Sequence, residues 1–405
     1  MKIMLLGSLI SAEAIEELNS HSKEVASVAP VNYETMLAKG LVENGAQVDA
    51  ISVPAVAAYP NSIYKKMEAR VETVLPCLIA KWVPFTNIQG LKQMTIKRNV
   101  YRMLKCWLEE NRHIKDKMVM MYSIYPPYTG PAQRLCKKYG CHLNVVITDL
   151  PEYMYSWKKS KGLRSLYARY LQKQMLKQQT GCDSYILFTE KMAARMSVET
   201  KPYMVSEGFS DSSVFASLPP VEKYEKTTIV YGGNLSKLYG IRALVDGFML
   251  TTGDYELHLY GAGIDSAYIQ QCAKKDTRIR FFGRVTRNEL LLALKKAHLL
   301  VINKPTADDY SNYSFSSKIL EYMVSGTPVL TTRVGGMPVE YYDYFYFIDD
   351  ESPEGIAETI EKTLNKADLR NMGEKARKYA CKEKNYCSMT KKILTFLNIE
   401  INTKI

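Results

Sequence analysis

Short apolar runs alternate with stretches of helical periodicity along most of the chain. In the first half this pattern predicts helices near residues 33–44 and 131–139 and strands at 2–6, 48–53, 118–122 and 142–148. Regular alternation of strands and helices is typical of a parallel sheet wrapped by helices. The first half is therefore expected to form a doubly wound α/β domain.

The same pattern restarts after a polar stretch around residues 210–226. It predicts strands at 228–231, 255–260, 279–282, 299–303 and 328–331, which alternate with helices near 241–250, 265–274, 287–297 and 315–324. A last helix is expected from residue 376 to about 397.

Two Rossmann-like α/β domains are thus expected. The N-terminal domain covers residues 1–205 and the C-terminal domain 206–385, with a hinge at 206–208. A terminal helix at 386–405 is expected to return to the N-terminal domain. A chain of 405 residues exceeds what one hydrophobic core usually spans, which supports the division.

Composition narrows the class of protein. No run approaches the 18 apolar residues that a membrane-spanning helix needs. Lys2 followed by the apolar residues 3–10 loosely imitates a signal peptide, but the run is short and equally suits a first strand, which is the interpretation kept here. The eight cysteines form no CxxC pair, so reduced thiols in a cytoplasmic protein are expected and a metal site is not.

The chain is strongly basic, with a net charge of +12 and a pI near 9.1. Such a charge favours an anionic partner, which leaves nucleic acid, a membrane surface and a phosphorylated substrate open. No helix-turn-helix, zinc or RNP pattern supports nucleic acid, which stays a distant alternative.

Three glycine- or serine-rich segments follow predicted strands of the second half. The first contains Gly232, Gly233 and Asn234 and leads through Lys237 into a helix. Glycines there allow a phosphate-bearing ligand to approach the backbone, and Lys237 would neutralise it. A plain turn is the open alternative.

The second segment is Tyr-Gly-Ala-Gly at 260–263, followed one strand later by Gly283, Arg284 and Val285. The spacing around Gly261 lacks the third glycine of the dinucleotide fingerprint, so NAD is disfavoured. A flat nucleobase is instead expected to lie on the backbone of residues 283–285.

The third segment, YSFSSKILEYMVSGTPV at 313–329, is the most specific. Ser316 and Ser317 open a helix that carries Lys318 in its first turn and Glu321 in its second. The N–H groups of such a helix start suit a diphosphate, and a carboxylate further along suits ribose hydroxyls. The alternative is that Glu321 is only a solvated helix residue.

Residues 227–365 resemble the donor-binding domain of GT-B fold, retaining family-4 glycosyltransferases. The resemblance lies in the glycine turn, "YGAG", "FFGRV" and "YSFSSKILEYM", the last of which is similar to a bacterial surface-polysaccharide branch. It implies a cleft between the two domains, with a nucleotide sugar, by default a UDP-sugar, on the C-terminal domain and the acceptor on the N-terminal one. It also implies transfer with retention and no metal or other cofactor.

Two features depart from the family pattern. The first of two glutamates that the family carries eight residues apart is Tyr313 here. The positions of the usual basic pair on the diphosphate are Asn234 and Tyr239. Candidates to replace that pair are Lys237, Lys318, Arg284 and Arg333.

Asp149 ends a predicted N-terminal strand. It is a candidate for orienting an acceptor hydroxyl, and a turn role before Pro151 is the alternative. A nucleotide-sugar epimerase or a phosphorylase remains an alternative function, although no acid/base pair is evident.

Two acid-free basic stretches lie in the first half, at 81–105 and 157–180. Basic residues interleaved with apolar ones suit an anionic membrane surface, and a solvated helix face is the alternative. Because the resemblance implies lipid-diphosphate-linked acceptors, docking at the inner face of the cell membrane is one expectation for this cytoplasmic protein.

Overall fold

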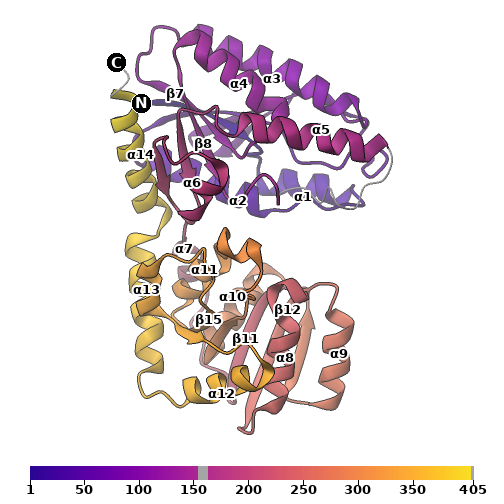
Figure 1. Ribbon diagram of the computed structural model, residues 1–405, viewed down its shortest axis with the longest axis vertical. Coiled ribbons are helices and arrows are strands. Elements are labelled where there is room, and N and C mark those ends of the chain that lie inside the picture. The colour runs from indigo at the N-terminus through magenta and orange to yellow at the C-terminus, as the bar shows by residue number, and fades with distance from the viewer. Residues whose placement is uncertain (154–162, 403–405) are drawn as a thin grey trace. The chain divides into compact units, whose positions relative to one another are not determined.

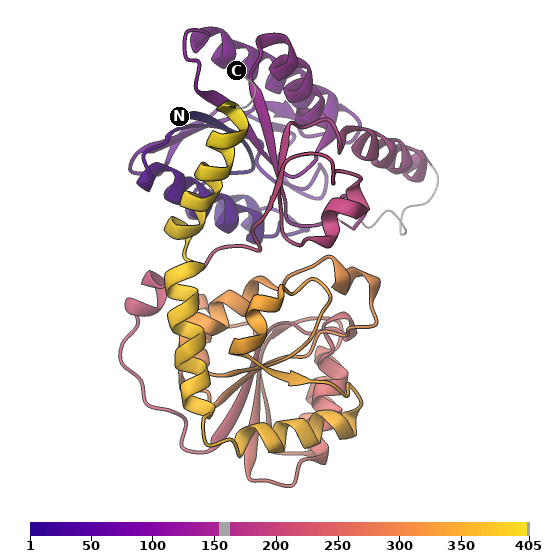
Figure 2. The same cartoon turned by 60° about the vertical axis from the view of Figure 1, so that its left-hand side comes forward.

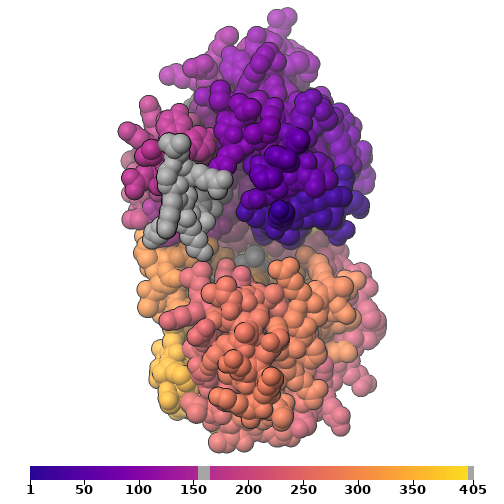
Figure 3. Space-filling view, turned by 90° about the vertical axis from the view of Figure 1, so that its right-hand side faces the viewer, coloured from indigo at the N-terminus to yellow at the C-terminus, as the bar shows by residue number. Residues whose placement is uncertain are grey.

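The computed structural model describes residues 1–153 and 163–402, without the side chains of 163, 164, 317 and 400–402. The chain divides into two compact units (Figure 1). The N-terminal unit comprises Met1–Glu207 and Tyr386–Ile405, and the C-terminal unit comprises Gly208–Asn385. In the space-filling view the first is indigo to magenta and the second mainly salmon to orange (Figure 3).

The N-terminal unit is built on an eight-stranded sheet in the order β10-β9-β8-β7-β1-β2-β5-β4. All neighbouring strands run parallel except β4 and β5. The strands are β1 (Lys2–Gly7), β2 (Gln47–Ser52), β4 (Val71–Leu75), β5 (Leu78–Trp82), β7 (Lys117–Tyr122), β8 (His142–Ile147), β9 (Ser184–Leu187) and β10 (Tyr203–Val205). A separate antiparallel pair joins β3 (Lys66–Met67) to β6 (Phe85–Thr86).

Most helices of this unit connect successive strands, as the alternating pattern predicts, whereas α14 comes from the end of the chain. They are α1 (Ala12–Ser20), α2 (Ala29–Glu43), α3 (Leu91–Glu110), α4 (Pro126–Tyr139), α5 (Leu163–Gln178), α6 (Lys191–Met196) and α14 (Tyr386–Asn402). The yellow helix α14 lies against the N-terminal unit (Figure 2), where it packs on α2.

The C-terminal unit has a six-stranded parallel sheet in the order β13-β12-β11-β14-β15-β16. This is the classic Rossmann order, in which the chain adds strands on one side of β11 and then returns to its other side. The strands are β11 (Thr227–Asn234), β12 (Tyr255–Ala262), β13 (Ile279–Gly283), β14 (Leu299–Ile302), β15 (Val329–Thr332) and β16 (Tyr346–Ile348).

Helices cover both faces of this second sheet. They are α7 (Ser213–Ala216), α8 (Ile241–Leu250), α9 (Ser266–Lys275), α10 (Arg287–Lys296), α11 (Ser317–Ser325), α12 (Pro353–Leu364) and α13 (Leu369–Glu383), with 3-10 turns η2 (Lys237–Tyr239), η3 (Asp309–Asn312) and η4 (Val339–Tyr344). Alternate residues of β11 supply two separate cores, since Ile229 packs in one apolar cluster and Val230 in the other. The sheet is therefore buried on both faces, which explains the near-continuous apolar runs of its strands.

The expectation of a single helix from 376 to about 397 is wrong. The chain breaks at Lys384 and Asn385, and α13 and α14 belong to different units. The Asn385 side-chain amide donates to the carbonyls of Cys381 and Lys382 (2.7 and 2.9 Å), so it ends α13 with side-chain hydrogen bonds.

The predicted glycine turns also begin later than expected. Gly232 and Gly233 belong to β11 and pair with Tyr260 and Gly261 of β12. Gly261 has a φ of +126°, and a Cβ there would lie 1.8 Å from the Gly233 carbonyl oxygen. The glycines therefore bring the backbones of two adjacent strands unusually close before either chain turns.

Gly261→Ala is expected to destabilise the C-terminal unit by about 2 kcal/mol or more, because both the positive φ and the backbone contact forbid a Cβ. Gly283→Ala is the matched control. Gly283 also has a positive φ, +68°, but an added Cβ would meet no atom within 4 Å. Urea unfolding measures both, and equal losses in the two variants would show that the close contact at Gly261 does not matter.

Candidate functional site

The C-terminal sheet has its topological switch point between β11 and β14. In open parallel sheets, ligands bind at the carboxyl ends of the strands at such a point. Here the carboxyl end of β11 carries Gly232 and Gly233, and β14 ends next to Asn303. The turn after β11 approaches β14 closely, since a Cβ on Gly240 would lie 1.6 Å from the Asn303 carbonyl oxygen.

Lys318 of α11 places its ammonium group at this switch point. A Cβ added to Gly233 would lie 1.7 Å from Lys318 Nζ, so only glycine leaves room for the side chain. Nζ donates to Tyr231 Oη (3.3 Å) and lies over the rings of Tyr231 and Tyr239, 4.8 and 5.3 Å from their centroids. Burial among these groups lowers the pKa of Lys318 to about 8, although Glu321 raises it.

Glu321 follows Lys318 by three residues, which places both side chains on one face of α11. Its Oε1 accepts from Arg287 Nη2 of α10 at 3.1 Å. Burial raises the pKa of the Glu321 carboxyl, while Arg287 and Lys318 act to lower it. About a quarter of the side chain (27%) is exposed, so the carboxylate is partly desolvated yet accessible to a ligand.

Tyr322 fixes α11 against the end of β11. The Gly232 N–H donates to Tyr322 Oη at 2.8 Å, and Oη donates to the Gly232 carbonyl at 3.3 Å. The ring is fully buried in the core. This contact sets the position of the helix, and with it the positions of Lys318 and Glu321.

Sequence analysis missed Asn303 and Lys304, which directly follow β14. Asn303 is buried and donates through Nδ2 to the Gly240 carbonyl at 3.1 Å. Lys304 is also buried; Nζ donates to Ser314 Oγ and lies 4.2 Å from the centroid of the Tyr310 ring. In the sequence, the only indication of these residues was that two polar side chains directly follow an apolar strand. The structure adds that this strand end lies at the switch point of the sheet.

The residues expected to hold a nucleobase lie at the end of β13, the edge strand next to β12. Gly283 opens the turn with positive φ, Arg284 is exposed and Val285 is half-buried. Behind the turn, the Phe282 ring stacks on Tyr260 with centroids 4.6 Å apart and planes within 6°. This stack gives the turn a rigid aromatic base.

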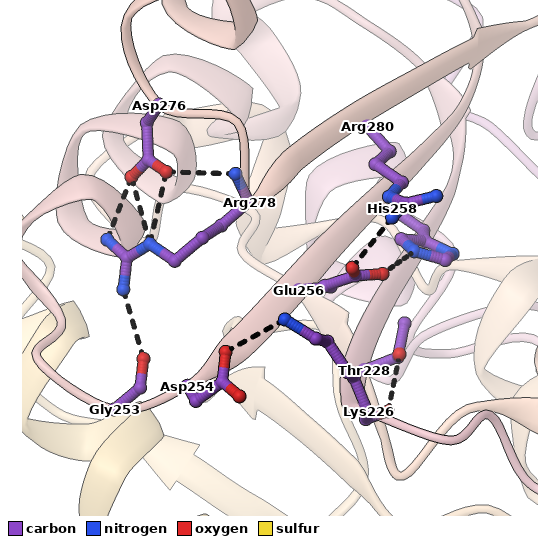
Figure 4. Close-up of polar contacts among 9 residues, drawn as sticks. All are labelled: Lys226, Thr228, Gly253, Asp254, Glu256, His258, Asp276, Arg278 and Arg280. Atoms are coloured by element: carbon purple, nitrogen blue, oxygen red, sulfur yellow. Dashed lines mark hydrogen bonds and ion pairs between the residues drawn. The ribbon is translucent and has the colours of Figure 1, made fainter.

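His258 and Glu256 form a buried pair farther down β12 (Figure 4). His258 Nε2 and Glu256 Oε2 are 2.8 Å apart, and Arg280 Nη2 donates to Glu256 Oε1 at 2.9 Å. Burial lowers the pKa of His258 despite Glu256. Burial also opposes ionisation of Glu256, but His258 and Arg280 together keep its pKa below the usual value.

Several residues predicted to bind the donor lie near the switch point, at the end of β11 or just before α11. Asn234 and Lys237 are exposed in and after the end of β11. Tyr313 and Ser316 precede α11 and are half-buried, with Ser316 as its N-cap. The Ser317 side chain lies outside the described part of the chain.

Of the candidates for the missing basic pair, Arg333 is engaged elsewhere. It pairs with Asp349 and lies 3.9 Å from the centroid of the Phe347 ring. Arg284 is exposed beyond β13. Lys318 is therefore the candidate that the structure brings to the switch point.

The N-terminal unit has a cavity at the carboxyl ends of β1, β2 and β7. It encloses ≈ 420 Å³ and is lined mainly by apolar and tyrosine side chains together with Ser8, Ser123 and Lys92. Ser123 has a φ of +66°, an uncommon conformation for a residue other than glycine. Asp149 is half-buried just beyond β8; burial raises the pKa of Tyr122, and the Asp149 carboxylate adds to that rise. Its role toward an acceptor remains a prediction.

Beneath the same cavity, Glu34 of α2 is buried and accepts from the Ser8 N–H through both carboxylate oxygens (2.9 and 3.0 Å). Burial raises the pKa of Glu34 to about 7, although the Ser8 hydrogen bonds lower it. Glu34 thus ties the loop after β1 to α2.

Two Rossmann-like units, each built on a mainly parallel sheet whose strand order reverses at one point, define the fold of GT-B glycosyltransferases. Solved structures of this fold align over the whole chain. Sucrose-phosphate synthase from Thermosynechococcus elongatus superimposes with a TM-score of 0.67 at 14% identity and covers 100% of both chains. HepE of Anabaena in complex with UDP gives a TM-score of 0.62 at 13% identity over 98% of this chain and 100% of that chain.

Residues 218–379 match the family model described as glycosyl transferases group 1. N-acetyl-alpha-D-glucosaminyl L-malate synthase from Bacillus anthracis is 31% identical over 157 residues, which are 37% of this chain and 39% of that relative. The chain thus aligns with well under half the length of this curated relative. The resemblance to GT-B glycosyltransferases is confirmed in the fold and in the sequence of the C-terminal unit.

In the described residues, no helix is both long and apolar enough to cross a membrane.

Proposed function

We propose that this protein is a glycosyltransferase that moves a sugar from a nucleotide donor, by preference a UDP-sugar, to a saccharide acceptor. The observation that carries the proposal is that α11 places the Lys318 ammonium group at the carboxyl end of β11 and carries Glu321 three residues later on the same face. A cation beside a glycine-lined strand end suits a diphosphate, and a partly desolvated carboxylate suits ribose hydroxyls. HepE, a protein of the same fold, has been solved with UDP and with UDP-glucose.

In this proposal the nucleobase lies on the turn at Gly283, backed by the Phe282–Tyr260 stack. The diphosphate accepts hydrogen bonds from Lys318 and from N–H groups of the first turn of α11. As the bond from the anomeric carbon to the diphosphate breaks, negative charge grows on the leaving group, and these donors stabilise it. The sugar is transferred with retention, without a metal ion or other cofactor.

The acceptor is proposed to bind the cavity of the N-terminal unit near Ser8 and Ser123. Three tyrosines, Tyr122, Tyr125 and Tyr128, line this cavity. Flat aromatic side chains with a hydroxyl group offer both apolar contact and hydrogen bonds, as a saccharide requires. We further propose that the acceptor is a lipid-linked saccharide in surface-polysaccharide synthesis, and that the protein works in the cytoplasm at the membrane surface.

Thermal shifts with UDP, GDP, ADP, CMP and their sugars test the donor site. One nucleotide series is expected to raise the Tm of the wild type, because a ligand at 100 times its Kd stabilises the native state by about 2.7 kcal/mol. We expect this series to be that of UDP. Absence of any shift across the panel would overturn the proposed donor site, and turnover of a nucleotide sugar without an acceptor would point to an epimerase.

A further inference from the structure

Five large apolar side chains, two in the first turn of α3 and three in the segments before it, are exposed to solvent. They are Tyr59, Ile63, Ile88, Leu91 and Met94, with exposed fractions between 39% and 67%. Apolar residues exposed singly are common, but a contiguous set marks a surface that another body covers. These five residues are called the apolar patch below.

Backbone contacts bring residues of the apolar patch next to one another. Tyr59 and Ile88 form a parallel β-bridge. The Leu91 N–H donates to the Ile88 carbonyl at 3.1 Å, at the first residue of α3. Met94 follows Leu91 by one helical turn, so both side chains lie on the same face of α3.

Asn87 fixes the remaining member of the patch. This fully buried side chain donates through Nδ2 to Ser62 Oγ (3.2 Å) and to the Tyr64 carbonyl (2.9 Å), the two residues on either side of Ile63. The backbone carbonyl of Asn87 accepts from the Tyr59 N–H at 2.8 Å. The exposed side chains are thus held on an ordered support.

Exposed cations lie near the apolar patch along the chain, and one of them, Lys66, pairs with Glu68 at 2.9 Å. Lys65 and Lys66 lie beside Ile63 in the chain, and Lys97 and Arg98 lie one turn beyond Met94 on α3. Helix α3 contains no acidic residue before Glu109. Arg98 follows Leu91 by seven residues, so a basic stripe continues the apolar face along the helix.

We propose that the apolar patch inserts into the headgroup region of an anionic lipid bilayer, with the cations of α3 against lipid phosphates. Apolar residues at a helix tip and cations behind them match the apolar and anionic layers of such a surface. The inference rests on the proposed lipid-linked acceptor and names the surface that reaches it. The same helix connects the patch to the acceptor cavity, because Lys92, next to Leu91, lines that cavity and donates to the Val56 carbonyl at 2.5 Å.

Co-sedimentation of the full chain with phosphatidylglycerol vesicles, and with phosphatidylcholine vesicles alone, tests the proposal. The wild type is expected to bind the anionic vesicles and to be released by salt. Leu91→Ser/Met94→Ser is expected to bind about tenfold more weakly, since two apolar side chains no longer enter the bilayer. Lys97→Ala/Arg98→Ala is expected to lose about fivefold for each cation removed.

Leu166→Ser/Tyr170→Ser is the comparison variant: these side chains are similarly exposed on α5, at 62% and 57%, and lie in the second basic stretch, which the proposal leaves outside the bilayer. Its binding is expected to equal that of the wild type. Equal loss in both double variants, or no vesicle binding by the wild type, would overturn the assignment. If Leu91→Ser/Met94→Ser instead abolished self-association and left vesicle binding unchanged, the occupant would be a second copy of the chain. Unchanged Tm shifts with UDP would separate failure of docking from failure of the donor site.

Discussion

Glu321→Ala is expected to lower the affinity for the nucleotide donor and kcat/KM by about 100-fold, which corresponds to about 2.7 kcal/mol. A hydrogen bond to a charged group contributes about 1.5–3 kcal/mol, and in the proposed site the carboxylate accepts from ribose hydroxyls. Its environment strengthens such bonds, because burial already raises its pKa and leaves only a quarter of the side chain in water. Isothermal titration with UDP and initial-rate kinetics measure the loss.

Stability of the free protein separates this loss from misfolding. Only Arg287 forms an ion pair with Glu321 among the described residues, and the Arg287 side chain is 58% exposed. Its charge stays solvated when the partner is removed, so the free energy of unfolding is expected to change by no more than about 0.5 kcal/mol. Arg287→Ala is the matched control, since it breaks the same ion pair and keeps the carboxylate. An equal loss of UDP affinity in Arg287→Ala would contradict a direct role for Glu321.

The fold was largely readable from the sequence, because the C-terminal sheet is parallel throughout, the N-terminal sheet is parallel except for β4, and most of their strands are buried. Strands of that kind appear as apolar runs between helices, and most of those expected are present within two residues. The break between α13 and α14 was not readable, since helical periodicity continues through Lys384 and Asn385. What ends α13 there is the Asn385 side chain, and what separates the helices is packing on different units.

The site was only partly readable. Serines, a lysine and a glutamate at 316–321 indicated an anion-binding helix start with a carboxylate beyond it. Sequence spacing could not decide which cation lies at the diphosphate position, because Lys237 and Lys318 come from segments far apart in the chain. The structure favours Lys318, because Gly233 has no side chain and leaves the space that Lys318 Nζ occupies. Asn303 and Lys304 were missed because strand order, rather than any local motif, brings the end of β14 next to β11.

Lys318→Met is expected to weaken UDP binding strongly while it stabilises the free protein. Lys318 is a desolvated cation whose pKa burial lowers to about 8, so folding opposes its protonated form. Stability therefore rises with pH between about 8 and the unfolded value near 10.4 in the wild type, and methionine removes that cost at pH 7. We expect a gain of about 1 kcal/mol in the free energy of unfolding and a loss of about 100-fold in UDP affinity.

The same pKa predicts how binding depends on pH. A diphosphate needs the protonated amine, so the affinity of the wild type for UDP is expected to fall as pH rises above about 8, with proton uptake on binding there. Titrations at pH 8.5 in two buffers of different ionisation enthalpy measure that uptake. Lys318→Arg keeps the charge at every pH and is expected to lose the pH dependence, whereas Lys237→Met, which removes an exposed cation, is expected to retain it. If Lys237→Met lost the pH dependence of UDP affinity and Lys318→Arg retained it, the diphosphate would lie at Lys237. Gly233 would then serve only the packing of Lys318.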